Sequence, residues 1–332
     1  MSNPSSNPSH IAPSVEELRR ELGIRPASRL VRVLPKSIQG FMTSTKGVIG
    51  VILLCVLLLS SILAPILATH DPYRRSGAPR EAPTAEHVLG TTRLGKDVYS
   101  QMLYGGRVSL TVGFVAGTVA TLIGIVIGIS CGYFGGRVDE ILTFIVNVAL
   151  VLPALPLIIV IAAYVEHASP IIIGLVLAAT GWGWSARAIR SQTLALRNRE
   201  FVLAAELMGE AKWRIILVEI LPNMLSFLVG GFVLATIYSI LAEAGLEFIG
   251  LGDPSSVTWG TMLYAAQKSQ ALDVGAWWEI WPPCIAIILT GAALAFINFA
   301  VDEVTSPRLR AGRKIGVVRK FLSKRGRSAD VF

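Results

Sequence analysis

The sequence predicts an all-α integral membrane protein with six transmembrane helices, and two observations support this prediction. Only 16% of the 332 residues are charged and 53% are hydrophobic, whereas about a quarter of a soluble domain is charged. Six windows of at least 19 residues lack any ionisable side chain, and a helix needs about 20 residues to cross the ~30 Å hydrocarbon core. Buried helices of a soluble protein do not reach this number and length. The expected spans are about 47–69, 108–131, 141–165, 168–186, 220–242 and 280–301.

The distribution of basic residues predicts that both chain ends lie on the inner side. With the N-terminus inside, the inner segments hold 23 Lys and Arg and the outer segments hold 7, as the positive-inside rule requires. The net charge of +8 is then explained by the membrane topology and by attraction of basic residues to anionic lipids. No basic segment is interleaved with aromatic residues, so we do not expect nucleic-acid binding.

Three regions follow from this topology. Residues 1–46 form a cytoplasmic extension in which Ser14-Val-Glu-Glu17 is a capping box for a short helix. Its basic, mildly amphipathic stretch 25–36 either lies along the inner leaflet or belongs to a disordered tail. Residues 47–310 form the six-helix domain, and 311–332 form a basic cytoplasmic tail.

The second and third spans carry distinct packing signals. Glycines 113, 117, 124 and 128 recur along the second span, where small residues allow close helix packing. Residues 98–104 are expected to form a short helix that leads into this span. In the third span, Pro153 and Pro156 predict a kinked or interrupted helix. Asn147 either makes an interhelical hydrogen bond or forms part of a polar path. Candidates for a pathway or gate are Asn147, Pro153, Pro156 and Ser239.

Two outer segments carry polar residues. His87 and Asp97 are too few ligands for a metal, and His87 is expected at the surface; the three cysteines fall in spans without paired spacing. We therefore predict no metal site. Residues 243–279, here called the outer segment, hold five acids and one lysine. Their length predicts a folded cap or a re-entrant scoop.

A charged hairpin, here called the knuckle, spans residues 199–223 between the fourth and fifth spans. Gly209 stands where a first short helix needs a residue with positive φ in order to end, and Pro222 redirects the chain after a second helical run. Phe201, Ala205 and Met208 lie roughly in line on the first helix, which gives an apolar ridge flanked by charges. Such a ridge indicates a docking surface.

The sequence lacks the usual residues of membrane enzymes. It has no Gly-x-x-x-x-Gly-Lys-Ser/Thr loop for a nucleotide. All four histidines and all carboxylates lie outside the expected spans, so a zinc protease, an aspartyl dyad or a proton relay has no residues to use. No catalytic residue is predicted, and energy must come from a partner. A polytopic membrane enzyme and a passive channel remain the alternative classes.

The motifs resemble the inner-membrane permease subunits of ATP-binding-cassette (ABC) importers, in the dipeptide, oligopeptide and nickel branch, from about residue 46 to 310. The hallmark of that family is Glu-Ala-Ala, three residues and Gly, followed by a segment that ends in Leu-Pro. Here Leu203 replaces the glutamate, so a carboxylate contact is lost or is supplied by Glu200 or Glu206. The hallmark positions that match are Ala204, Ala205, Gly209, Leu221 and Pro222, and further matches are 87–97, 104–110, 132–140, 242–252, 259–260 and 302–310.

The resemblance implies a half-transporter that works with several partners. These are a second homologous permease, two ATPase subunits that bind ATP and Mg, an extracytoplasmic substrate-binding protein and membrane lipids; this chain binds no cofactor itself. Peptides are the favoured cargo, and a nickel chelate, glutathione or an oligosaccharide are alternatives. The resemblance implies ATPase coupling at Glu200, Phe201, Leu203, Ala204, Ala205, Glu206, Met208, Gly209, Lys212 and Trp213. It implies contact with the binding protein at Glu243, Glu247, Asp253 and Trp259.

Overall fold

The computed structural model describes residues 44–164 and 169–305, which belong to two compact units. One unit is the helical body Lys46–Asp302. The other is described only at residues 44–45 and 303–305, where Ser44 Oγ donates a hydrogen bond to Glu303 Oε2 at 2.9 Å. The predictions for residues 1–43, 165–168 and 306–332 lie outside the described residues.

The regular secondary structure of the described residues is helical, apart from one isolated antiparallel bridge between Thr91 and Asp97, and loops join the helices. Five helices among them are long and apolar enough to cross a membrane: Thr45–Ile62, Val98–Phe134, Pro170–Arg197, Leu225–Phe248 and Trp277–Glu303. The all-α membrane class is therefore confirmed, and six spans with an N-in/C-in orientation remain a prediction. The α-helices are α4 (Thr45–Ile62), α5 (Ala64–Leu67), α6 (Val98–Phe134), α7 (Gly136–Val151), α8 (Ala154–Tyr164), α9 (Pro170–Arg197), α10 (Glu200–Leu207), α11 (Lys212–Arg214), α12 (Leu221–Asn223), α13 (Leu225–Phe248), α14 (Trp259–Lys268) and α15 (Trp281–Thr305).

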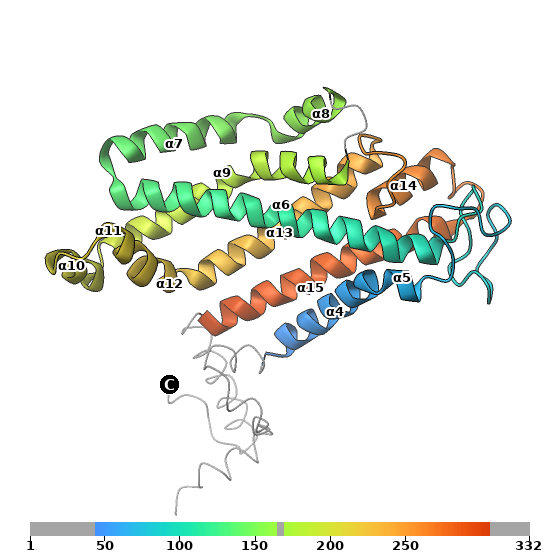
Figure 1. Cartoon of the computed structure of the whole chain (residues 1–332), viewed down its shortest axis with the longest axis horizontal. Coiled ribbons are helices and arrows are strands. Elements are labelled where there is room, and N and C mark those ends of the chain that lie inside the picture. The colour runs from blue at the N-terminus through green and yellow to red at the C-terminus, as the bar shows by residue number, and fades with distance from the viewer. Residues whose placement is uncertain (1–43, 165–168, 306–332) are drawn as a thin grey trace, which may run out of the picture. The chain divides into compact units, whose positions relative to one another are not determined.

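The helix α6 is the central element of the body and packs along both α9 and α13 (Figure 1). It runs unbroken for 37 residues, so the helix expected at 98–104 is present and is continuous with the second span. Asp97 caps its first turn by accepting a hydrogen bond from the Ser100 N–H at 2.8 Å. The loop that precedes α6 is thereby joined directly to the first turn of this helix.

The glycines of α6 provide the close packing that the sequence predicts. Gly113 and Gly117 face α13, whereas Gly124 and Gly128 face α9. A Cβ atom on Gly128 would lie 2.6 Å from the backbone oxygen of Ala186, which is closer than real Cβ contacts allow. The helices α13 and α9 therefore pack closely against successive parts of α6, as membrane helices with small residues at their interface do.

The third expected span is interrupted, as its prolines predict. The helix α7 ends before Leu152, whose extended backbone (φ −62°, ψ 126°) precedes Pro153, and α8 then begins at Ala154. Extended conformation is what the ring of a following proline imposes. Each of the two short helices packs against α9.

The fifth helix is displaced relative to the expected span. It begins at Leu225 rather than 220 and continues to Phe248 rather than 242, so Glu243 and Glu247 lie within it. The expectation that no carboxylate lies in a spanning helix is therefore wrong. The rest of the outer segment is folded: α14 begins with a capping box between Thr258 and Thr261 and packs on α13 and α6.

Candidate functional site

The knuckle is built from three short helices and a π-helical stretch. It consists of α10, α11, the π-helix Ile215–Ile220 and α12, and α13 follows. Gly209 has φ +75°, and the next N–H, that of Glu210, donates to the Ala205 carbonyl at 3.1 Å. The predicted positive-φ stop of the first helix is confirmed. The π-helix ends just before Pro222, where the chain turns into the fifth helix.

The inner face of α10 is part of the hydrophobic core. Val202 and Ala205 are buried together with Tyr133 of α6, Ile189 of α9 and Ile215 of the π-helix. The predicted ridge of Phe201, Ala205 and Met208 is therefore wrong in one member, because Ala205 points inward. The other nine residues predicted for ATPase coupling are exposed.

Four large apolar side chains of α10, its C-cap and α11 are exposed, and we call them the apolar patch: Leu203, Leu207, Met208 and Trp213. Leu207 is 89% exposed and Met208 is 76% exposed, far more than apolar side chains have in a protein core. The sequence reasoning missed Leu207. Helical spacing could have found it, since it lies on the face opposite Val202 and Ala205.

Polar contacts fix the knuckle and the neighbouring turn. The Tyr133 hydroxyl donates to Glu206 Oε1 at 3.2 Å, which ties α10 to α6. Arg190 of α9 donates to both carboxylate oxygens of Asp139 in α7, at 2.6 and 2.7 Å, a bidentate pair. These contacts join α10 to α6 and α7 to α9.

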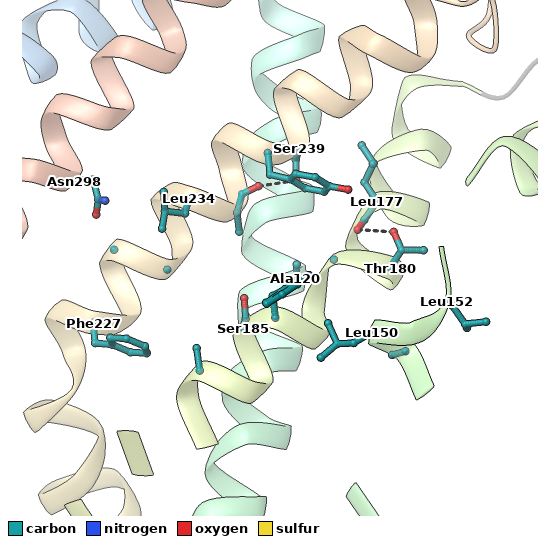
Figure 2. Close-up of a pocket in the computed structure, with 18 of the residues that line it drawn as sticks. Ala120, Leu150, Leu152, Leu177, Thr180, Ser185, Phe227, Leu234, Ser239 and Asn298 are labelled. Carbon is teal, nitrogen blue, oxygen red and sulfur yellow. Dashed lines mark hydrogen bonds between the residues drawn. The ribbon is translucent and has the colours of Figure 1, made fainter. Parts of the chain in front are cut away.

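A cavity of about 810 Å³ lies in the helical body. Figure 2 shows side chains from α7, α9, α13 and α15 around it, including Leu150, Thr180, Phe227 and Asn298. Its wall is mainly apolar, with a few hydroxyl groups, the amide of Asn298 and the carboxylate of Asp302. Thr180 and Ser239 donate their hydroxyls to carbonyls of their own helices, Val176 and Ala235. Asn298 Oδ1 is buried and has no hydrogen-bond partner among the described residues.

The structure places two of the four predicted pathway residues at the cavity and two elsewhere. Pro153 and Ser239 line the cavity, and Asn147 and Pro156 do not. Asn147 Oδ1 instead accepts a hydrogen bond from Arg187 at 2.9 Å, which is the interhelical alternative. Asn298, which the sequence analysis did not single out, contributes the polar atom without a partner.

Three of the four predicted binding-protein contacts are buried. Glu243 is 0% and Trp259 is 2% exposed, so neither presents a surface to a partner. Ser109 Oγ donates to Glu243 Oε1 at 3.1 Å, and Trp259 Nε1 donates to the Met102 carbonyl at 3.2 Å. Glu247 is buried as well and accepts from Thr258 Oγ1. These residues fasten α13, α14 and α6 together, and only Asp253 is partly exposed.

The expected surface position of His87 is also wrong. Its side chain is buried, and Nδ1 lies 3.0 Å from Asp97 Oδ1. Burial by itself raises the pKa of Asp97, but hydrogen bonds from Ser100 and His87 lower it more, so the pKa lies below the ordinary 3.8. Asp97 is consequently an anion at neutral pH.

Comparison with known proteins identifies the family. The family model for the binding-protein-dependent transport system inner membrane component matches residues 124–311. The dipeptide transport system permease DppC of Bacillus subtilis is 34% identical over 263 residues, which are 79% of this chain and 81% of that protein. A putative peptide transport system permease of Brucella suis is 34% identical over 79% of this chain and 88% of its own length. The oligopeptide transport system permease OppC of Bacillus subtilis is 29% identical over 81% and 88%.

These matches agree with the structure, since both describe a multi-pass membrane protein. The similar proteins are transport permeases, in keeping with a subunit that carries out no catalysis itself. The chain belongs to the family of binding-protein-dependent transport system inner membrane components, the plasma-membrane permease subunits of ABC importers.

Proposed function

We propose that this chain forms half of the translocation pathway of an ABC importer for di- or oligopeptides and couples it to a partner ATPase through the knuckle. The observation that carries the proposal is the exposed apolar patch of Leu203, Leu207, Met208 and Trp213. Side chains this exposed and apolar indicate a protein interface. The peptide cargo is supported by the names of the similar permeases.

The knuckle is suited to pass on movement because its two faces have different roles. The inner face packs on α6 and α9, and the Tyr133–Glu206 hydrogen bond adds a polar link. An ATPase that binds the outer face and closes on ATP and Mg would move these helices as packed elements. In an N-in/C-in orientation the knuckle is cytoplasmic, where ATP is available.

The cavity suits a pathway of low selectivity. Its walls are largely apolar, and the hydroxyls of Thr180 and Ser239 are already bonded within their helices. Asn298 and Asp302 are among the few polar groups left to meet a peptide. Such a surface offers few fixed partners to any particular peptide side chain. A second permease would complete the pathway, and an external binding protein would select and deliver the cargo.

The coupling part is tested with a substitution in the patch. Leu207→Asp in the assembled transporter should abolish copurification of the ATPase subunits and ATP-dependent uptake, because a charge would be placed in the apolar contact. Leu272→Asp is the matched control, since Leu272 is also exposed, at 61%, in the outer segment. Retained ATPase binding and uptake in Leu207→Asp would refute coupling through this patch.

The cargo part is tested separately. The substrate-binding protein that copurifies with the transporter should carry a bound peptide, which mass spectrometry of the extracted ligand identifies. A nickel chelate, glutathione or an oligosaccharide in its place would overturn the peptide assignment and leave the coupling proposal intact.

A further inference from the structure

We propose that His70, His87 and Asp97 bind a divalent transition metal, with Zn²⁺ the best-suited ion. One nitrogen of each histidine and one carboxylate oxygen of Asp97 all lie within 4.8 Å of one another. The two imidazole rings are 4.7 Å apart between centroids. Ligand atoms about 2.0–2.2 Å from a tetrahedral Zn²⁺ lie roughly 3.3 Å from each other, so small side-chain rotations suffice to close the site.

The separation between His87 and Asp97 is already that of neighbouring ligands. His87 Nδ1 and Asp97 Oδ1 are 3.0 Å apart. The other ring nitrogen of His87 faces Gly77, where an added Cβ would lie 2.6 Å from Nε2. Nδ1 is therefore the nitrogen on the side of Asp97. A metal ion would replace the hydrogen bond between them.

Ser100 holds the other two ligands in place. Its backbone N–H and its hydroxyl donate to Asp97 Oδ2 at 2.8 and 2.6 Å, which leaves Oδ1 directed at the histidines. The His70 backbone N–H donates to Ser100 Oγ at 3.1 Å, so the same hydroxyl positions His70. Outer-shell hydrogen bonds of this kind orient the ligands of metal sites.

His70 distinguishes a metal site from a simple helix cap. To orient Asp97 at the start of α6, the His87–Asp97 hydrogen bond is sufficient, and no second histidine is needed. The ring of His70 nevertheless lies against His87 and is only partly exposed. Its Nδ1 is 3.1 Å from Thr69 Oγ1, which leaves Nε2 available to an ion.

The ligand set indicates the class of ion and its effect. Two imidazole nitrogens and one carboxylate oxygen suit Zn²⁺ and related ions better than Ca²⁺ or Mg²⁺, which prefer oxygen ligands. The fourth position is left for water. The ion would join three separate stretches of chain, at residues 70, 87 and 97, and so fasten the long loop after α5 to the first turn of α6.

The test uses the assembled transporter, purified without a polyhistidine tag. Substitutions His10→Ala and His167→Ala remove the other two histidines of the chain, and a chelator removes bound metal. Titration with Co²⁺ should give the visible absorption of a tetrahedral site at one ion per chain, and Zn²⁺ should displace it. His70→Ala should weaken binding at least ~100-fold, the upper end of the effect of losing an outer-shell partner.

Two further measurements keep the test decisive. Glu86→Ala, an exposed acid beside His87, should bind Co²⁺ like the unmodified chain, which controls for nonspecific acidic binding. Zn²⁺ should raise the unfolding temperature of the transporter, and His70→Ala should remove this increase while the complex still assembles. Absence of stoichiometric binding, or equal binding and stabilisation in His70→Ala, would overturn the proposal.

Discussion

The knuckle and the outer segment share features of composition but differ in the exposure of their side chains. Both lie between apolar helices, both mix acids with aromatic side chains, and both were expected to face a partner. In the knuckle Leu207 and Met208 are almost fully exposed, whereas in the outer segment Glu243 and Trp259 are buried. Composition therefore identifies a segment that is not simply lipid-facing, and packing decides whether it can bind a partner.

The physical difference lies in the neighbours of each segment. The helix α10 has eight residues and buries only Val202 and Ala205, so the rest of its surface stays in solvent. Glu243 and Glu247 are one helical turn apart on α13, and Ser109 and Thr258 supply hydrogen bonds to them. Burial of a carboxyl is tolerable only where such donors are present.

The largest effect is expected from Gly209→Pro. Proline cannot adopt the φ of +75° at this position, so the turn between α10 and α11 would be lost together with ATP-dependent uptake. Membrane insertion, measured by fractionation, should be retained. Loss of insertion would show that this turn is needed for folding of the chain in the membrane and not specifically for coupling.

Gly275→Pro is the matched control for the same comparison. Gly275 also has a positive φ of +76°, and no atom lies within 4 Å of an added Cβ at either glycine. Both N–H groups donate to a carbonyl at 3.0 Å. Uptake should survive in Gly275→Pro, and equal loss in the two variants would remove the distinction between the regions.

Replacing a tryptophan in each region should affect stability very differently. Trp259→Ala removes a buried ring and its hydrogen bond to Met102, which should destabilise the protein by about 3–5 kcal/mol. Trp213→Ala removes an exposed ring, and its effect should lie within about 0.5 kcal/mol. Thermal unfolding of the purified transporter measures both. Similar losses would show that the knuckle is also a packed element.

The smallest effect is expected from Leu203→Glu. The side chain is 47% exposed, so the free energy of unfolding should change by no more than about 0.5 kcal/mol. The substitution restores the hallmark acid of the family and should change only the affinity for the ATPase, measured by titration of purified subunits. An unchanged affinity would show that the patch binds without a carboxylate at this position.

Several features of the protein depend on local chemistry and are predicted correctly from the sequence. Charge-free windows predict long apolar helices, Pro153 predicts the break between α7 and α8, and Gly209 predicts the end of α10. Each follows from the backbone or solvation properties of one residue or one continuous stretch. Local signals of this kind do not depend on which distant residues pack nearby.

Which polar residues are buried, and which come into contact, depends on tertiary packing. Glu243 is buried within the fifth helix, and its hydrogen-bond donor Ser109 lies 134 residues earlier in the chain. His70, His87 and Asp97 converge because Ser100 orients two of them. The inner face of α10 is set by Tyr133 and Ile189 on other helices. These outcomes depend on contacts between residues far apart in the chain, which no local pattern of the sequence records.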